Sequence, residues 1–157
     1  MINDRDVAIL DVLQKDSNTP LVELGDKVSL SPSACSRRIA NLKEEGYIRR
    51  NVAVLDREKL GLSTSVFVTV SARVHSAEWN AKFRLAVAEI SEIVEVYRLT
   101  GNIDYLLKII LPSIEDYDRV YKTLVSRIDM NVVSASIVME IVKDSESLPL
   151  GSVTTSI

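Results

Sequence analysis

The sequence has few of the residues from which proteins build covalent or metal sites. Its 157 residues include one cysteine, Cys35, and one histidine, His75. A single cysteine excludes an internal disulfide, which is typical of a protein in the reducing cytoplasm. One cysteine and one histidine do not supply the ligands of a usual zinc site. We therefore expect no metal and no cofactor, and His75 is the only candidate for histidine-based catalysis.

Long apolar runs are lacking too. No run approaches the roughly 18–20 apolar residues that a membrane-spanning helix needs, and the first six residues already carry charge, unlike a signal peptide. The composition, 46% hydrophobic and 26% charged, is that of a globular protein. We expect a cytoplasmic protein without membrane association, long enough for one ordinary domain or two small ones.

Positive charge is scarce except in one segment. The chain has a net charge of −3, but residues 29–50 contain five basic and two acidic residues, so this segment carries +3 and the remainder −6. A basic segment on an acidic protein indicates a local site for a polyanion, because a generally adhesive surface would spread its charge.

The basic segment belongs to a pattern that is typical of three short helices. Asp4 can cap the first helix. Thr19-Pro20 and Ser31-Pro32 each place a capping side chain before a proline at the first helical position. Gly46 ends the third helix. Three helices, the last two joined by a short turn, describe a helix-turn-helix.

The third helix has one buried face and one face suited to double-stranded DNA. Cys35, Ile39 and Leu42 fall within one narrow arc and are expected in the core. From the opposite face Arg37 could read guanine in the major groove, while the flanking cations would contact phosphates without reading sequence. A simpler alternative is a solvated basic face. The candidate DNA-binding residues are Ser31, Ser33, Ala34, Ser36, Arg37, Arg38, Asn41, Lys43, Arg49 and Arg50.

The second half of the chain alternates between strand and helix periods. The expected elements are strand 64–74, helix 77–90, strand 93–99, strand 104–111, a helix opened by Ser113 and Asp116, and strand 131–143. This βαββαβ order is the ferredoxin-like arrangement, so the fold class is α+β. The expected division is a helix-turn-helix domain at 1–55, a linker at 56–62, a ferredoxin-like domain at 63–143, and an unassigned tail at 144–157.

A βαββαβ sheet leaves one face without helices. Phe67, Tyr97 or Leu99, and much of the run "LLKIIL" would lie on or near that face. A soluble chain seldom leaves so large an apolar surface in water. Sheet-to-sheet pairing in a homodimer is the simplest cover, and a two-fold dimer is also what a helix-turn-helix needs to read a palindrome.

Three stretches together resemble the Lrp/AsnC, or feast/famine, family of transcription regulators. They are "LSPSACSRRIANLKEEGYI", "LTGNIDYLLKI" and "SIVMEIVK". The resemblance implies an N-terminal helix-turn-helix, a ferredoxin-like effector domain (the RAM domain), and dimers that assemble further, for example into octamers. It also implies a small-molecule effector, in many members an amino acid, bound between dimers.

The resemblance assigns roles to individual positions. Ser33, Ser36 and Arg37 correspond to residues that face DNA. The positions assigned to the effector site are Leu99, Thr100, Gly101, Asn102, Asp104, Ser134 and Ser136. Asp104 could accept from an α-ammonium group, and turn N–H groups suit an α-carboxylate. The alternative is that Gly101 and Asp104 only form a hairpin turn.

Two positions depart from the family pattern, and two other functions compete. Gly25 stands where the family usually has alanine, at a cost of about 1 kcal/mol. Ser29 stands where the family usually has the turn glycine, which costs roughly 1–2 kcal/mol if the residue is left-handed. The same architecture resembles siroheme decarboxylases, which use histidine and arginine around a tetrapyrrole; the single histidine, His75, and the intact basic helix count against this interpretation. A metabolite-binding protein without DNA binding would not need the basic segment.

Overall fold

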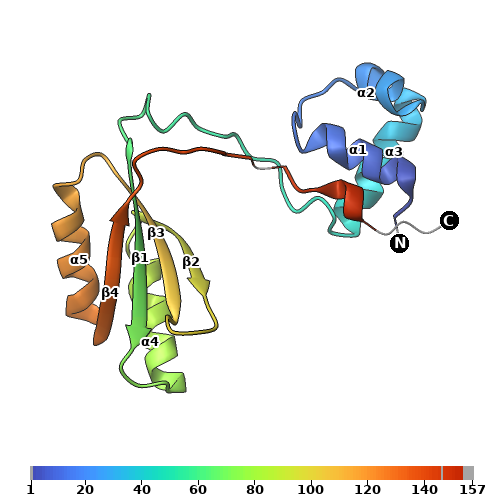
Figure 1. The fold of residues 1–157 in the computed structure, drawn as a ribbon. Helices are drawn as coiled ribbons and strands as arrows, with labels where there is room; N and C mark the ends of the chain where they lie inside the picture. The colour runs from blue at the N-terminus through green and yellow to red at the C-terminus, as the bar shows by residue number, and fades with distance from the viewer. Residues whose placement is uncertain (1, 146, 154–157) are drawn as a thin grey trace. The chain divides into compact units, whose positions relative to one another are not determined.

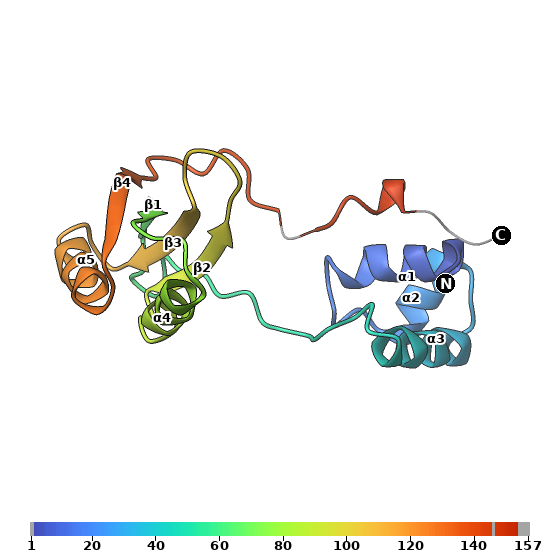
Figure 2. The same ribbon diagram turned by 90° about the horizontal axis from the view of Figure 1, so that it is seen from below.

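The chain forms two compact units. The computed structural model describes residues 2–145 and 147–153. One unit comprises the chain up to Val54 together with the segment from Lys143 onward, and the other is Leu55–Val142 (Figures 1 and 2). The chain therefore passes between the units twice. No helix in the described ranges is long and apolar enough to cross a membrane.

Three helices form the body of the first unit: α1 (Asp4–Leu13), α2 (Leu21–Val28) and α3 (Pro32–Glu44). Their core cluster consists of Ile2, Ile9, Leu24, Val28, Cys35 and Leu42. Cys35 and Leu42 are 0% and 3% exposed, so α3 buries the face that its spacing predicts. The predicted helix-turn-helix is confirmed.

The helix caps agree with the sequence at α3 and differ elsewhere. Ser31 caps α3 as predicted. Asn3, rather than Asp4, caps α1, because Asn3 and Asp6 accept each other's backbone N–H, both at 3.1 Å. The predicted Thr-Pro start of α2 is wrong by one residue, since Pro20 itself precedes the helix and no side chain caps it.

The turn between α2 and α3 explains the glycine at position 25 and shows that serine at position 29 is strained. Ser29 is left-handed, with φ +53° and ψ +53°, and the N–H groups of Ser29 and Leu30 both donate to the Gly25 carbonyl. A Cβ at Gly25 would lie 2.4 Å from the Leu30 oxygen. The turn therefore brings its own backbone against residue 25, where only glycine fits.

The second unit is a four-stranded antiparallel sheet with two helices. Its elements are β1 (Thr64–Ala72), α4 (Ala77–Ala88), β2 (Ile93–Arg98), β3 (Tyr105–Leu111), α5 (Asp116–Arg127) and β4 (Met130–Ile137), with strand order β2-β3-β1-β4. The α+β class and the βαββαβ order are confirmed. The predicted last strand, 131–143, is too long. Because β1 begins at Thr64 and the Val138 N–H already bonds to Ser65, the residues beyond have no β1 partner.

Both helices cover the same face of the sheet (Figure 2). Alternate β1 residues Val66, Val68 and Val70 are 1%, 2% and 0% exposed and belong to the same core cluster as α4 and α5 side chains. The strand alternation therefore separates a helix-covered face from an open face, as the sequence predicts.

The open face consists of cross-strand rows that include apolar and charged side chains. The register places Tyr97, Leu106, Thr69 and Ser134 in one row, and Glu95, Lys108, Phe67 and Ser136 in the next. Lys108 Nζ lies 2.9 Å from Glu95 Oε1. The Tyr97 hydroxyl and then the Lys108 ammonium lower the pKa of Glu95, which keeps this carboxylate charged.

The expected linker, residues 56–62, is folded into the second unit. The Leu62 N–H donates to the Arg57 carbonyl at 2.8 Å, and the Arg57 guanidinium donates to the Ser65 hydroxyl. Ser65 is only 3% exposed, so this bond satisfies a buried polar group. The structure places the boundary between the units at Val54 and Leu55.

Candidate functional site

The outer face of α3 presents polar side chains to solvent at the start of the helix. Ser33, Ser36, Arg37 and Asn41 are all exposed, and Ala34 is half-buried. These five predicted residues are therefore available to a ligand on one helix face. Their arrangement suits a helix whose first turns enter the major groove of duplex DNA.

Most of the polar backbone of the first turn of α3 is already committed. Ser31 Oγ accepts the Ala34 N–H at 3.2 Å and lies 3.1 Å from Ser33 Oγ. Pro32 has no N–H, and the Cys35 N–H donates to the Ser31 carbonyl. Of this turn, the Ser33 N–H is the group left for a phosphate among the described residues, and Ser31 acts first as a cap.

The adjacent arginines of α3 differ in their surroundings. Arg37 is exposed. Arg38 Nη1 lies 2.7 Å from Asp6 Oδ1 and 3.5 Å from Asn3 Oδ1, and its side chain is only 30% exposed. The charge of Arg38 is therefore compensated by α1, which weighs against the phosphate contact expected for it.

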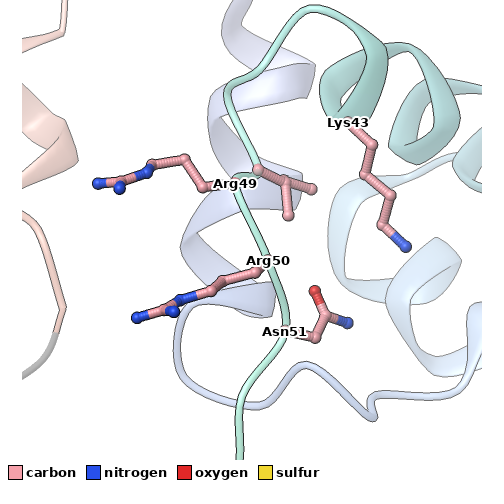
Figure 3. Close-up of a pocket in the computed structure, with 5 residues that line it drawn as sticks. Lys43, Arg49, Arg50 and Asn51 are labelled. Atoms are coloured by element: carbon pink, nitrogen blue, oxygen red, sulfur yellow. The ribbon is translucent and has the colours of Figure 1, made fainter.

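Three further cations surround a hollow at the end of α3. The hollow measures about 410 Å³ and is lined by Lys43, Ile48, Arg49, Arg50 and Asn51. Figure 3 shows Lys43 on one side, with the two guanidinium groups pointing away from it. The cations diverge, so they do not enclose a single anion. They could instead meet phosphates spaced along an extended backbone.

The loop from Leu99 to Asp104 is fixed to the sheet by its last residue. The Asp104 N–H donates to the Val70 carbonyl at 3.1 Å, and Asp104 Oδ2 accepts the Ala72 N–H at 2.8 Å. Asp104 Oδ1 lies 3.8 Å from His75 Nε2, and the carboxylate is 24% exposed. One oxygen of Asp104 is thus structural, and the other lies toward the exposed side chain of His75.

The middle of this loop is open. Gly101 has a φ of +119°, a conformation that favours glycine, and a Cβ placed there would meet nothing within 4 Å. Thr100 and Asn102 are exposed, and Leu99 is 37% exposed. No hydrogen bond from the N–H groups of residues 100–103 occurs within the described part of the chain, so these groups remain available to a ligand.

Ser134 and Ser136 lie on the open face of the sheet and not beside this loop. Ser134 pairs with Thr69 and Ser136 with Phe67, so β1 separates both serines from β3. Both are exposed. A site that combines the loop with these serines is therefore not formed by neighbouring strands of the sheet.

Comparison with known proteins agrees with this architecture. Residues 65–148 match the family described as Lrp/AsnC ligand binding domain, and residues 2–49 match winged helix-turn-helix DNA-binding. The chain belongs to the Lrp/AsnC family. It is a transcriptional regulator with a DNA-binding and a ligand-binding domain. In the described residues up to Val54, no strand follows α3 to form a wing.

Individual Lrp/AsnC relatives match almost end to end. The HTH-type transcriptional regulator Zrp of Zymomonas mobilis is 48% identical, with 95% of this chain and 97% of the relative covered. The crystal structure of an AsnC family regulator from Agrobacterium tumefaciens has a TM-score of 0.91 at 40% identity, covering 96% of this chain and 98% of that one. A Neisseria meningitidis regulator, solved as an L-methionine complex, has a TM-score of 0.90 at 32% identity, covering 96% and 97%.

Sequence reasoning missed the contacts that α1 makes with the other helices. Asp6 holds Arg38, and Arg5 donates to the Val28 and Ser29 carbonyls. The spacing of Asn3 and Asp6 is that of a capping box and could have identified Asp6 as fixed. No local signal identifies the target of Arg5, because its acceptors lie 23 and 24 residues away.

Proposed function

We propose that α3 reads duplex DNA through Arg37 and its neighbours Ser33 and Ser36. The observation that carries this proposal is that these three side chains lie exposed at the start of a capped helix whose opposite face is buried. Arg37 is long enough to pair with a guanine edge in the major groove. The two serines and Asn41 would refine the choice of base.

The phosphate contacts come from the cations around the end of α3. Lys43, Arg49 and Arg50 are exposed and point in different directions, so each could neutralise a separate phosphate. Such contacts fix register and contribute affinity without reading sequence. Arg38 is not among them in this proposal, because Asp6 compensates its charge.

Matched arginine variants test this division of roles. We expect Arg37→Ala to lose about 1–3 kcal/mol on a specific duplex and little on a random one. Arg49→Ala should weaken binding to both duplexes and flatten the slope of log affinity against log salt by about 0.9. Arg84→Ala removes the same charge from an exposed position of α4 and should change neither the affinity for the two duplexes nor the salt slope. Fluorescence anisotropy over a salt series measures all three, and an unchanged Arg37 variant would remove Arg37 from base readout.

The open sheet face pairs with a second copy of the chain. Phe67, Leu106 and Ile110 are only half-buried there, and Tyr97 is 49% exposed. A two-fold dimer would cover this surface and present two reading helices to a palindromic site. Further assembly of dimers, for example to octamers, would allow surfaces from different dimers to meet.

The effector is an amino acid bound at the loop from Leu99 to Asp104. The free N–H groups around Gly101 suit a carboxylate, and Asp104 Oδ1, which takes no part in the bond to the Ala72 N–H, suits an ammonium group. Ser134 and Ser136 would come from a neighbouring copy. The L-methionine complex of the Neisseria relative supports this ligand class.

An enzymatic role gains no support from the surroundings of the single histidine. His75 is 68% exposed at its side chain and lies 3.8 Å from Asp104 Oδ1. A siroheme decarboxylase would need further histidines around a tetrapyrrole. A fold shared with such enzymes does not by itself indicate decarboxylase activity. A regulator of this kind acts where the DNA is, in the cytoplasm.

A further inference from the structure

The first turn of α1 contacts both of the other helices through two consecutive residues. Arg5 donates to the carbonyls of Val28 and Ser29, the latter at 2.7 Å. Asp6 accepts from Arg38 at 2.7 Å. We infer that Arg5 and Asp6 are positioning residues that fix the orientation of α3, and that Arg38 is a structural arginine withheld from DNA. This inference rests on the proposed role of α3 in reading DNA.

The side chain of Asp6 is held in place by Asn3 as well as by Arg38. Its Oδ2 accepts the Asn3 N–H, and its own N–H donates to Asn3 Oδ1, both at 3.1 Å. The Asp6 side chain is 13% exposed and that of Arg38 is 30% exposed, so water screens this ion pair less than a surface pair. The pair therefore ties α3 to a rigid helix start.

Arg5 performs the equivalent task at the end of α2. The last carbonyls of a helix lack intrahelical partners and carry partial negative charge, so a cation there is favourable. The Arg5 guanidinium bridges two consecutive carbonyls and thereby holds the peptide after left-handed Ser29. Two residues later Ser31 caps α3, so the path of this turn sets where α3 begins.

The consequence is that two neighbouring arginines have opposite roles. Arg37 is exposed towards the DNA, whereas Arg38 joins α3 to α1. Loss of the Asp6–Arg38 pair would let α3 change its angle, which harms the fit to bases more than the attraction to phosphates. Selectivity between duplexes should therefore fall without a change in the number of phosphates that are neutralised.

A double-mutant cycle on the full-length protein tests the Asp6–Arg38 pair. The probes are a duplex enriched from a random pool by the wild-type protein and a scrambled duplex of the same composition. We expect Asp6→Ala and Arg38→Ala each to lower the affinity ratio between the probes on the order of tenfold, and the double variant to lose no more than either single variant. The salt slope of Arg38→Ala should equal that of the wild type.

A control variant and two contrary results make this test decisive. Glu23→Ala breaks an exposed ion pair with Lys27 in the same unit and should leave the ratio unchanged. A slope flattened by about 0.9 in Arg38→Ala would show a phosphate contact and overturn the inference, as would additive losses in the double variant. If Asp6→Ala fails to fold, Asp6→Asn keeps an oxygen for the Asn3 N–H and carries the same test. Loss of selectivity in Arg37→Ala shows separately that the proposed reading function holds.

Rescue tests the Arg5 contact. We expect Arg5→Ala to lower the same ratio on the order of tenfold, because Ser29 loses the group that holds its strained peptide. Ser29→Gly in the Arg5→Ala background should restore at least half of the lost selectivity, since glycine adopts this conformation without strain. A ratio unchanged in Arg5→Ala, or a loss that Ser29→Gly leaves untouched, would overturn the role of Arg5.

Discussion

The side chain of Gln14 exchanges two hydrogen bonds with the backbone of Leu148, 134 positions later in the chain. Gln14 Oε1 accepts the Leu148 N–H at 2.8 Å, and Gln14 Nε2 donates to the Leu148 carbonyl at 3.2 Å. The side-chain amide of Gln14 thus pairs with both the N–H and the carbonyl of one tail residue, as the backbone of a neighbouring β-strand does. Because the tail follows the second unit, this contact gives the DNA-binding unit a second connection to the rest of the chain.

Gln14→Ala should release the tail with little effect on the three-helix core. Exposed hydrogen bonds contribute only about 0.5–1.5 kcal/mol each, so we expect a small loss of unfolding free energy. Amide hydrogen exchange at Leu148 should accelerate by roughly tenfold. Gln14→Glu keeps the acceptor for the Leu148 N–H, so its exchange rate at Leu148 should lie between those of the wild type and Gln14→Ala. Equal exchange in Gln14→Ala and the wild type would contradict the anchoring role.

The turn before α3 offers a second prediction, on stability. Ser29→Gly should stabilise the first unit by roughly 1 kcal/mol, because serine is strained at φ +53°. Gly25→Ala should destabilise it although alanine favours helices, since the new Cβ would lie 2.4 Å from the Leu30 oxygen. Urea unfolding measures both variants. A stable Gly25→Ala protein would show that the turn can move aside.

Local signals were sufficient to predict the architecture. Ser31 before Pro32 located the start of α3, and the alternation at Val66, Val68 and Val70 located β1 and its buried face. What failed was the length of β4, because whether a strand continues depends on a partner strand and not on its own apolar residues. The predicted cap of α1 was wrong for a related reason, since the cap is a reciprocal pair formed by Asn3 and Asp6.

The sequence predicted which residues belong to the candidate sites, but not which of them are bound to other residues of the chain. The sequence identified Arg37 and Arg38 as adjacent cations, and helical geometry alone does not reveal that Asp6 compensates one of them. It also identified Asp104, without showing that one oxygen holds the Ala72 N–H. Contacts over long sequence distances decide which charges remain free, and periodicity carries no information about them.

The open sheet face leads to a prediction on assembly. Leu106→Glu places a carboxylate in the centre of this face and should raise the dimer dissociation constant on the order of 100-fold or more, because an unpaired buried charge is costly. Leu85→Glu introduces the same charge on α4, where Leu85 is 66% exposed, and should have no effect. Sedimentation at micromolar concentrations distinguishes them. A folded wild-type monomer that binds DNA tightly would contradict the proposed dimer.

The loop from Leu99 to Asp104, where we propose that the effector binds, gives the last prediction. Asp104→Asn keeps an oxygen for the Ala72 N–H but removes the charge, so the loop should keep its shape while the ammonium group loses its partner. We expect amino-acid affinity to fall roughly 10- to 100-fold, with basal DNA binding and dimerisation unchanged. A thermal-shift screen of all amino acids identifies the ligand, and DNA binding with and without it measures the response.

Two further variants separate the carboxylate from the rest of this site. Gly101→Val should also abolish the response, because valine is strained at φ +119° and fills the open loop. Thr100→Ala changes an exposed side chain of the same loop and should keep the response if backbone N–H groups bind the ligand. A defect in Gly101→Val alone would keep the site and remove Asp104 from it. If no amino acid stabilises the wild-type protein, the ligand class itself is wrong.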